Sequence, residues 1–221
     1  MKILMIVSLL LLAGCAPDPF TRPPLPVLNN PNPGSICAEF ASRLPARFTS
    51  DDTVVIDAPF GNEVAALGVL HVDRPAGTFE LVGLNPLGVK FFDIAGDRSA
   101  ATVRFALGPL MQHEDLLLAM AADIRRMYFD LVPGDDFQVD LQPTIVRYIK
   151  QKPEGRLVYE FGDEPAVLLE KRLDGFFGTV WRVRYYLYGK SPAAFPAGIV
   201  MDNNQFHYRI VVKNRDWEAG S

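Results

Sequence analysis

The chain has 221 residues, enough for one domain with a single substantial hydrophobic core. Its 22 basic and 26 acidic residues give a formal net charge of −4, and no block of basic residues occurs. This composition argues against electrostatic capture of nucleic acid or of anionic lipid by the folded part.

Residues 1–14 have the layout of a secretory signal peptide, because Lys2 precedes an apolar run from Ile3 to Leu12. About ten apolar residues cannot span a bilayer, which needs roughly twenty. The segment Leu12-Ala13-Gly14-Cys15 resembles the bacterial lipobox, in which the cysteine is acylated and becomes the new N-terminus. We therefore expect lipidation at Cys15, and the alternative is a plain signal peptide with an incidental cysteine.

Several acyl chains would anchor the protein permanently without a spanning helix. In the lipoproteins that carry this motif, an aspartate directly after the cysteine retains the protein in the inner membrane, and here that residue is Ala16. This predicts a lipid-anchored protein on the periplasmic face of the outer membrane of a Gram-negative bacterium. Cys37 is then the only other thiol, so that no disulfide stabilises the folded part.

Residues 15–34 hold the lipidated cysteine and seven prolines, a composition that favours extended polyproline II. We expect this segment to be a semi-rigid tether of up to roughly 60 Å that lifts the folded part off the bilayer. The remaining chain is expected to form one domain over residues 35–216, followed by a short C-terminal tail over residues 217–221.

Short β-prone runs alternate with turn residues on both sides of one helical segment. A short helix is expected from Ser35 as N-cap to a point before Pro45. Residues Glu114–Leu131 carry apolar side chains at helical spacing, and strands resume after a loop through Asp140. The expected strands are Val54–Asp57, Val64–Val72, Thr78–Leu84, Val89–Ile94, Ala101–Ala106, Ile145–Lys150, Leu157–Phe161, Val167–Leu173, Val180–Tyr188, Ala197–Met201 and Phe206–Lys213.

Ten or eleven strands in two meanders around one amphipathic helix predict a mainly β, α+β fold. We expect a strongly curved antiparallel sheet, or incomplete β-barrel, with a helical lid over its inner face. Apolar side chains there could line a cavity for acyl chains, or they could simply fill a core. The candidates for the cavity and its lid are Leu117, Met120, Ile124, Met127, Tyr128, Phe91, Trp181 and Tyr185.

The sequence lacks the usual constellations of catalysis. His71, His113 and His207 lie far apart and show no metal-binding spacing. There is no G-x-S-x-G elbow and no glycine-rich phosphate loop. The adjacent pairs Asp51-Asp52 and Asp135-Asp136 lie in turn-like surroundings, where neighbouring side chains point apart. We therefore expect no enzymatic activity, no cofactor and no metal ion.

The turn Asn85-Pro86-Leu87-Gly88 joins two apolar runs. Asparagine, proline and glycine are common turn residues, whereas a leucine is unusual at a tip that normally faces water. An apolar tip suits a turn whose working environment is a bilayer. The alternative is that Leu87 folds back onto its own sheet.

Several features together resemble the LolB-type outer-membrane lipoproteins, which share the LolA/LolB fold. They are the lipobox, the short first helix, the run from Phe79 to Gly88, the helix that closes with Tyr128–Pro133 and the hairpin over Pro196–Val212. The chain is also similar to a related group of lipoproteins, some of which accompany aryl-polyene or glycolipid pathways. The resemblance spans most of residues 36–213 and implies an incomplete β-barrel with a helical lid and a hydrophobic cavity.

In LolB-type proteins a leucine of the matching turn helps to hand acyl chains to the membrane, which implies a membrane-transfer loop at Leu84, Pro86 and Leu87. The resemblance thus implies a monomer that binds the acyl chain of a lipoprotein, glycolipid or polyene lipid. Such a protein would assist localisation of that cargo to the outer membrane and could receive it from a periplasmic lipoprotein carrier.

The alternative is a non-catalytic scaffold of a transport or lipid-biosynthesis complex. A connected apolar cavity beneath the helix favours the carrier, a solid interior favours the scaffold, and a polar cluster at the cavity floor would favour an enzyme.

Overall fold

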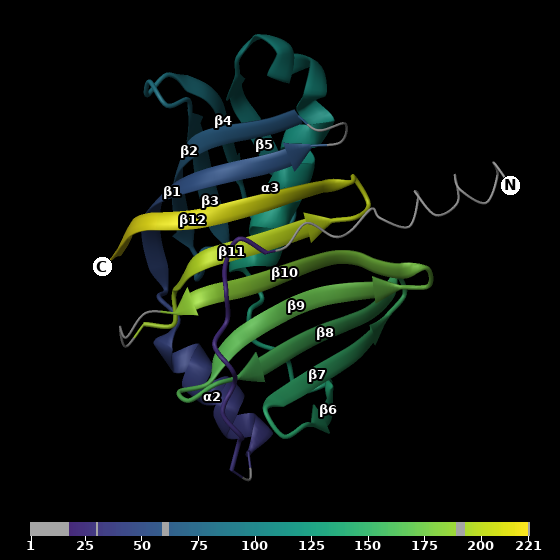
Figure 1. Cartoon of the computed structure of the whole chain (residues 1–221). Coiled ribbons are helices and arrows are strands. Elements are labelled where there is room, and N and C mark those ends of the chain that lie inside the picture. Colours follow the sequence, from purple (N-terminus) through teal and green to yellow (C-terminus); the bar gives the residue numbers. More distant parts are fainter. Residues whose placement is uncertain (1–17, 30, 59–61, 189–192, 221) are drawn as a thin grey trace, which may run out of the picture.

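The computed structural model describes residues 18–29, 31–58, 62–188 and 193–220. These residues form one antiparallel sheet of twelve strands, in the order β5-β4-β3-β2-β1-β12-β11-β10-β9-β8-β7-β6. The sheet is strongly curved but does not close, so β5 and β6 are its two edges (Figure 1). The predicted mainly β fold with a curved, open sheet is confirmed.

Two meanders meet in the middle of the sheet, where β1 pairs with β12. The first meander comprises β1 (Arg47–Ala58), β2 (Asn62–Asp73), β3 (Thr78–Leu84), β4 (Lys90–Gly96) and β5 (Ala101–Ala106). The second comprises β6 (Gln138–Leu141), β7 (Ile145–Lys152), β8 (Gly155–Gly162), β9 (Val167–Gly175), β10 (Gly178–Tyr188), β11 (Pro196–Asn203) and β12 (Tyr208–Ala219).

Antiparallel pairing places the turns after the odd-numbered strands at one end of the sheet. We call this end the odd rim: it consists of the segments that follow β1, β3, β5, β7, β9 and β11. The turns after the even-numbered strands lie at the opposite end, the even rim. The odd rim is therefore one mouth of the half-barrel.

Several strands are longer than the sequence predicts, and β1 begins at Arg47 instead of Val54. Strands β6 and β12 also change which segments belong to the sheet. The edge strand β6 lies in a segment predicted as a loop, because it has only four residues and its side chains are mostly exposed. Strand β12 continues to Ala219, so residues 217–219 belong to the sheet instead of a tail. The ring of Trp217 stacks on that of Phe195 with 4.8 Å between centroids, which fixes this end of the strand.

Helix α2 (Pro33–Arg43) begins three residues earlier than a helix capped by Ser35 would. Its N-cap is Asn32, whose side-chain oxygen accepts a hydrogen bond from the backbone N–H of Ser35 at 3.3 Å. An asparagine N-cap followed by proline at the first helical position is a favourable start. Phe40 secures the helix to the sheet, because its buried ring meets Phe161 edge to face.

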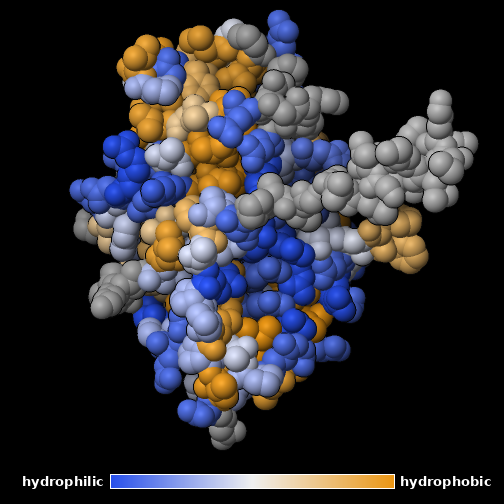
Figure 2. Space-filling view, in the orientation of Figure 1, coloured by the Kyte–Doolittle hydropathy of each residue, from blue (hydrophilic) through white to orange (hydrophobic). Residues whose placement is uncertain are grey.

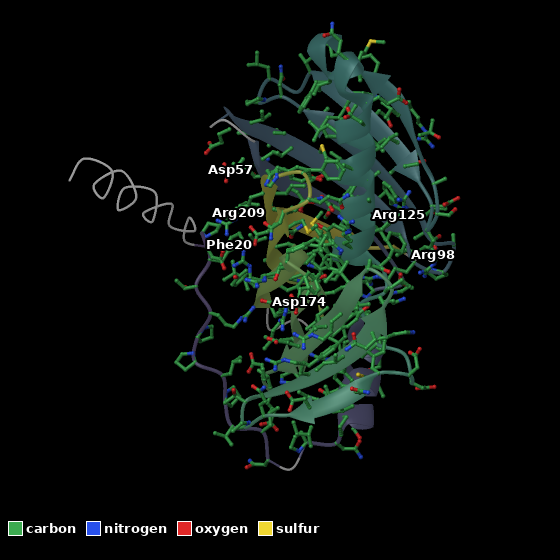
Figure 3. The ribbon with its side chains drawn as sticks, turned by 90° about the vertical axis from the view of Figure 1, so that its right-hand side faces the viewer. Phe20, Asp57, Arg98, Arg125, Asp174 and Arg209 are labelled. Carbon is green, nitrogen blue, oxygen red and sulfur yellow. The ribbon has the colours of Figure 1, made fainter. Side chains whose placement is uncertain are left out.

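Helix α3 (Glu114–Tyr128) lies on the concave side of the sheet and is preceded by the 3-10 helix η1 (Gly108–His113) (Figures 1 and 3). It ends three residues before the predicted Leu131. The stripe of residues predicted from helical spacing faces the sheet and is buried. No helix in the described part of the chain is both long and apolar enough to cross a membrane.

Residues 18–29, here called the strap, run along the outer face of the sheet, opposite α3 (Figures 1 and 3). Asp18 pairs with Arg184 at 2.9 Å and with Arg209 at 3.0 Å. Arg22 donates to the carbonyl oxygens of Leu169 and Tyr185. The sequence predicts a semi-rigid tether here, whereas the structure holds these residues against the sheet, because Asp18 and Arg22 between the prolines find partners on the outer face.

Candidate functional site

The first apolar space lies between α3 and the inner face of the sheet. Its volume is about 40 Å³, whereas sites for ligands of drug size usually measure about 300–1,000 Å³. We call it the closed hollow. It is lined by Met120, Ile124, Met127 and Tyr128 from α3 and by Asp52, Val54, Leu70, Leu81, Ile210 and Val212 from the sheet. The helix therefore fills the space that the sequence predicts to be a cavity, and no acyl chain fits there in this arrangement.

A buried polar cluster holds the middle of α3 against the sheet. Asp123 is fully buried, and its carboxylate accepts hydrogen bonds from the side-chain amide of Asn203 at 3.0 Å and from the hydroxyl of Tyr208. Burial raises the pKa of Asp123, while these two hydrogen bonds oppose the rise. Lifting the helix would break both hydrogen bonds to the sheet, which is costly inside a protein, although Asp123 would keep its ion pair with Arg126 of the same helix.

Side chains of the inner face also bind carbonyl groups at the C-terminal end of α3 and in the two residues that follow it. Lys171 donates to the carbonyl oxygens of Phe129 and Asp130, both at 3.1 Å, and the hydroxyl of Tyr185 donates to that of Met127 at 3.0 Å. A cation is favourable at the C-terminal end of a helix, where unpaired carbonyls concentrate negative charge. Burial lowers the pKa of Lys171 to about 8.

The second apolar space is an open groove of about 410 Å³ at the odd rim, here called the rim groove. Its apolar residues are Leu157, Leu173, Val180 and Trp181 from β8, β9 and β10. Arg126 of α3, Lys152, Glu154 and Gln205 complete the lining. The groove is within the usual size range of ligand sites.

The rim groove combines an apolar floor with cations. The guanidinium of Arg126 lies 5.2 Å from the ring centroid of Trp181, and the ammonium of Lys171 lies 6.0 Å from the same ring. The lining also includes the exposed Lys152. Arg126 is already paired with Asp123, so Lys152 is the exposed cation of the lining. The groove thus suits an amphipathic molecule whose alkyl part lies on the floor and whose anionic end meets Lys152.

The β3–β4 turn presents Leu87 to solvent at the odd rim. The side-chain oxygen of Asn85 accepts hydrogen bonds from the backbone N–H groups of Leu87 and Val89, both at 2.9 Å. Gly88 adopts a φ of +80°, which glycine tolerates best. Leu87 is 88% exposed, so it does not fold back onto its sheet, while Leu84 is partly buried at the end of β3. Pro86 is exposed beside it.

The residues predicted to line one cavity are divided among several places. Four of them line the closed hollow, Trp181 lines the rim groove, and Leu117 is packed in the core. Tyr185 caps α3, and the partly buried Phe91 meets Phe92 edge to face. Sequence reasoning did not identify Leu157, Leu173 or Arg126 as a site, because only the curvature of the sheet brings them together.

Asp52 forms a polar cluster at the closed hollow. Its carboxylate accepts hydrogen bonds from the Ser50 hydroxyl at 2.9 Å and from the Asn214 amide at 3.0 Å, and burial raises its pKa. Each carboxylate oxygen of Asp52 thus has a hydrogen-bond donor. The hollow has no room for a substrate. Among the described residues, no group of three or more His, Cys, Asp or Glu side chains could hold a metal ion.

Residues 61–216 match the family model described as "Protein of unknown function (DUF3261)". No curated protein matches the chain in sequence. Among solved structures, the chain is similar to a LolA superfamily protein from Nitrosomonas europaea, with a TM-score of 0.52 and 10% identity over 85% of this chain and 93% of that chain. This likeness confirms the predicted LolA/LolB-like fold.

Two further structures give lower scores. A DUF1329 family protein from Desulfovibrio piger has a TM-score of 0.49 and 12% identity, over 85% of this chain and 91% of that chain. A putative outer membrane lipoprotein-sorting protein domain from Vibrio parahaemolyticus has a TM-score of 0.45 and 11% identity, over 85% and 93% of the two chains.

Proposed function

The chain belongs to the DUF3261 family, and from its LolA-like fold and its rim groove we propose that it is a non-enzymatic, membrane-anchored carrier of acyl chains. The cargo is the acyl chain of a lipoprotein, glycolipid or polyene lipid. The protein assists its transfer to the outer membrane, to whose periplasmic face it is attached through Cys15. Cys15 itself lies outside the described residues.

The rim groove is the observation that carries this proposal. It is open, its floor is made of four apolar side chains, and its volume of about 410 Å³ suits part of a long alkyl chain. Each methylene group that leaves water contributes about 0.8 kcal/mol. Partial burial in an open groove therefore gives useful affinity while still allowing release, which a sealed cavity would hinder.

Delivery to the bilayer is assigned to the β3–β4 turn. Leu87 lies at the tip of this turn, on the same rim as the groove. The backbone N–H of Leu87 donates a hydrogen bond to the side chain of Asn85, which fixes the turn. We expect Leu87→Glu to leave folding and acyl-chain binding unchanged and to slow transfer of a fluorescent fatty acid from the protein to vesicles. Equal transfer rates for both proteins would remove Leu87 from the mechanism.

Quenching of tryptophan fluorescence tests the groove directly. The chain has two tryptophans, of which Trp181 lines the groove and Trp217 packs near the even rim. In the Trp217→Phe variant only Trp181 emits, and we expect bromopalmitate to quench it in a saturable manner that unlabelled palmitate reverses.

The matched control is Trp181→Phe, in which only Trp217 emits. Its emission should be little affected by bromopalmitate. Equal quenching of both variants, or none of either, would contradict binding in the rim groove.

The scaffold is a second candidate, and the closed hollow favours it. A carrier that uses the space beneath α3 needs room there, whereas the structure has about 40 Å³. If bromopalmitate fails to reach either tryptophan, an accessory role that depends on the outer surface becomes the better assignment.

A further inference from the structure

Two adjacent phenylalanines stand at the tip of the β9–β10 hairpin. Gly175 pairs with Gly178, so that Phe176 and Phe177 form a two-residue loop. They are 94% and 99% exposed, the highest exposures among the large apolar side chains described. Their rings contact each other edge to face at 4.9 Å. Packing within the described chain does not explain two exposed aromatic side chains on one turn.

The topology places this tip at the same rim as three other exposed apolar residues. The β9–β10 turn follows an odd-numbered strand, as do the turns that carry Leu87 and Phe206 and the segment that carries Met111. Figure 1 shows the β9–β10 turn at the right of the molecule. Figure 2 shows apolar surface gathered at the upper end, with a separate apolar patch at the right.

The phenylalanine tip also adjoins the mouth of the rim groove. Phe176 borders the β7–β8 turn together with Lys152 and Glu154, which line the groove as well. Val180 and Trp181 of the groove follow three and four residues after Phe177. A molecule that leaves the groove at this rim therefore passes the phenylalanines.

The beginning of the strap indicates where the lipid anchor attaches. Asp18 lines one hollow of the outer face together with Thr179, Asn204 and His207, which lie where β10 and β12 begin. The strap's first described residue thus lies between the odd rim and the middle of the sheet, because its carboxylate pairs with Arg209 near the start of β12 and with Arg184 in the middle of β10. Cys15 is only three residues before Asp18, so the anchor attaches within roughly 10 Å of that point.

We propose that the odd rim docks on a lipid bilayer and that Phe176 and Phe177 insert into it as a wedge beside the groove mouth. This inference rests on the proposed function, because it takes Cys15 as the lipid anchor and the groove as the acyl-chain site. The apolar tips stand on separate turns and do not form one continuous patch. A fluid bilayer can accept such separate tips simultaneously, whereas a rigid protein partner needs a complementary pocket for each of them.

Vesicle binding without the anchor tests the wedge. The chain with Cys15→Ala is mixed with vesicles of phosphatidylethanolamine and phosphatidylglycerol, and the bound fraction is measured by sedimentation. Each phenylalanine that leaves water for the acyl region accounts for about a tenfold change in affinity. We expect Phe176→Ser with Phe177→Ser to weaken binding by roughly a hundredfold.

Leu141→Ser is the matched control, because Leu141 is an exposed leucine next to the β6–β7 turn of the even rim. It should leave vesicle binding unchanged. In a separate variant, Phe177→Trp should shift its emission to shorter wavelength on vesicles and be quenched by brominated lipid. Unchanged binding of the double serine variant, or a tryptophan that brominated lipid does not quench, would overturn the wedge.

The same double serine variant separates this inference from the proposed function. Its Trp181 should still be quenched by bromopalmitate, because the groove floor is intact. Loss of vesicle binding with retained quenching supports the wedge. If bromopalmitate does not quench Trp181 even in the parent chain while vesicle binding depends on the phenylalanines, the carrier proposal fails and the docking surface stands.

Discussion

The closed hollow and the rim groove are built from the same inner face of one sheet, yet only the groove is open. Apolar side chains of α3 fill most of the hollow and leave a free volume of about 40 Å³, whereas the free volume of the groove at the odd rim is about 410 Å³. The difference arises where α3 ends. Lys171 and Tyr185 bind its last carbonyl groups, and no further turn of the described helix extends over the ends of β8–β10.

Helix α3 is better described as a plug than as a lid. Its middle is tied to the sheet by Asp123 and its end by Lys171, so opening the hollow requires breaking buried polar contacts. The groove needs no such movement. Acyl-chain binding is therefore expected at the rim, with the hollow acting as ordinary core.

The largest expected effect tests whether the hollow is core. Ile124→Ala should lower the free energy of unfolding by about 2–5 kcal/mol, because it removes buried methyl groups and leaves a cavity. Denaturant unfolding measures the change. Leu118→Ala, at an exposed position of the same helix, should change stability by less than about 0.5 kcal/mol. A comparably small effect of Ile124→Ala would show that the hollow is loosely packed.

The next largest effect tests the buried hydrogen bonds of Asp123, which hold the middle of α3 against the sheet. Asp123→Ala leaves the Asn203 amide and the Tyr208 hydroxyl without their buried acceptor, and we expect a loss of about 2–4 kcal/mol in thermal or denaturant unfolding. Asp115→Ala is the control, because Asp115 is exposed on the same helix. Equal stability of the two variants would mean that the cluster does not hold α3.

The pH dependence of stability tests the end of the plug. The pKa of Lys171 is about 8 in the folded protein, below its ordinary value of 10.5. Between these values the unfolded chain binds more protons, so the contribution of Lys171 makes the free energy of unfolding rise with pH, by about 1–3 kcal/mol in total. Unfolding curves between about pH 8 and about pH 10 should show this slope, and Lys171→Met should remove it. An identical slope in both proteins would contradict a lowered pKa for the buried Lys171.

The smallest expected effect concerns the edge of the groove. Lys152→Glu should weaken binding of palmitate about three- to fivefold, since an exposed charge contributes little, and should leave binding of the uncharged alcohol hexadecanol unchanged. Bromopalmitate quenching of Trp181, with the unlabelled ligands as competitors, measures both affinities. Lys213→Glu is the control, as Lys213 is exposed on β12 outside the groove lining. A similar loss for both variants would indicate a general charge effect instead of a contact at the groove.

The sequence by itself determined the local features of this protein. Turn residues and alternating apolar positions located most strands, and β3 and β5 have the predicted bounds. Helical spacing identified the buried stripe of α3, and the turn chemistry of Asn85 and Gly88 singled out Leu87. These features depend on neighbours in the chain, which is why they can be predicted from it.

Only the tertiary structure decided which apolar side chains enclose space and which fill it. Met120 and Trp181 are equally plausible cavity residues in the sequence, yet one fills the closed hollow and the other lines an open groove. The strap was expected to be part of a semi-rigid tether, but Asp18 pairs with Arg184 and Arg209, which lie far along the chain. The physical reason is that free volume and long-range pairing depend on the curvature of the whole sheet and on where α3 ends against it, and no local pattern records either.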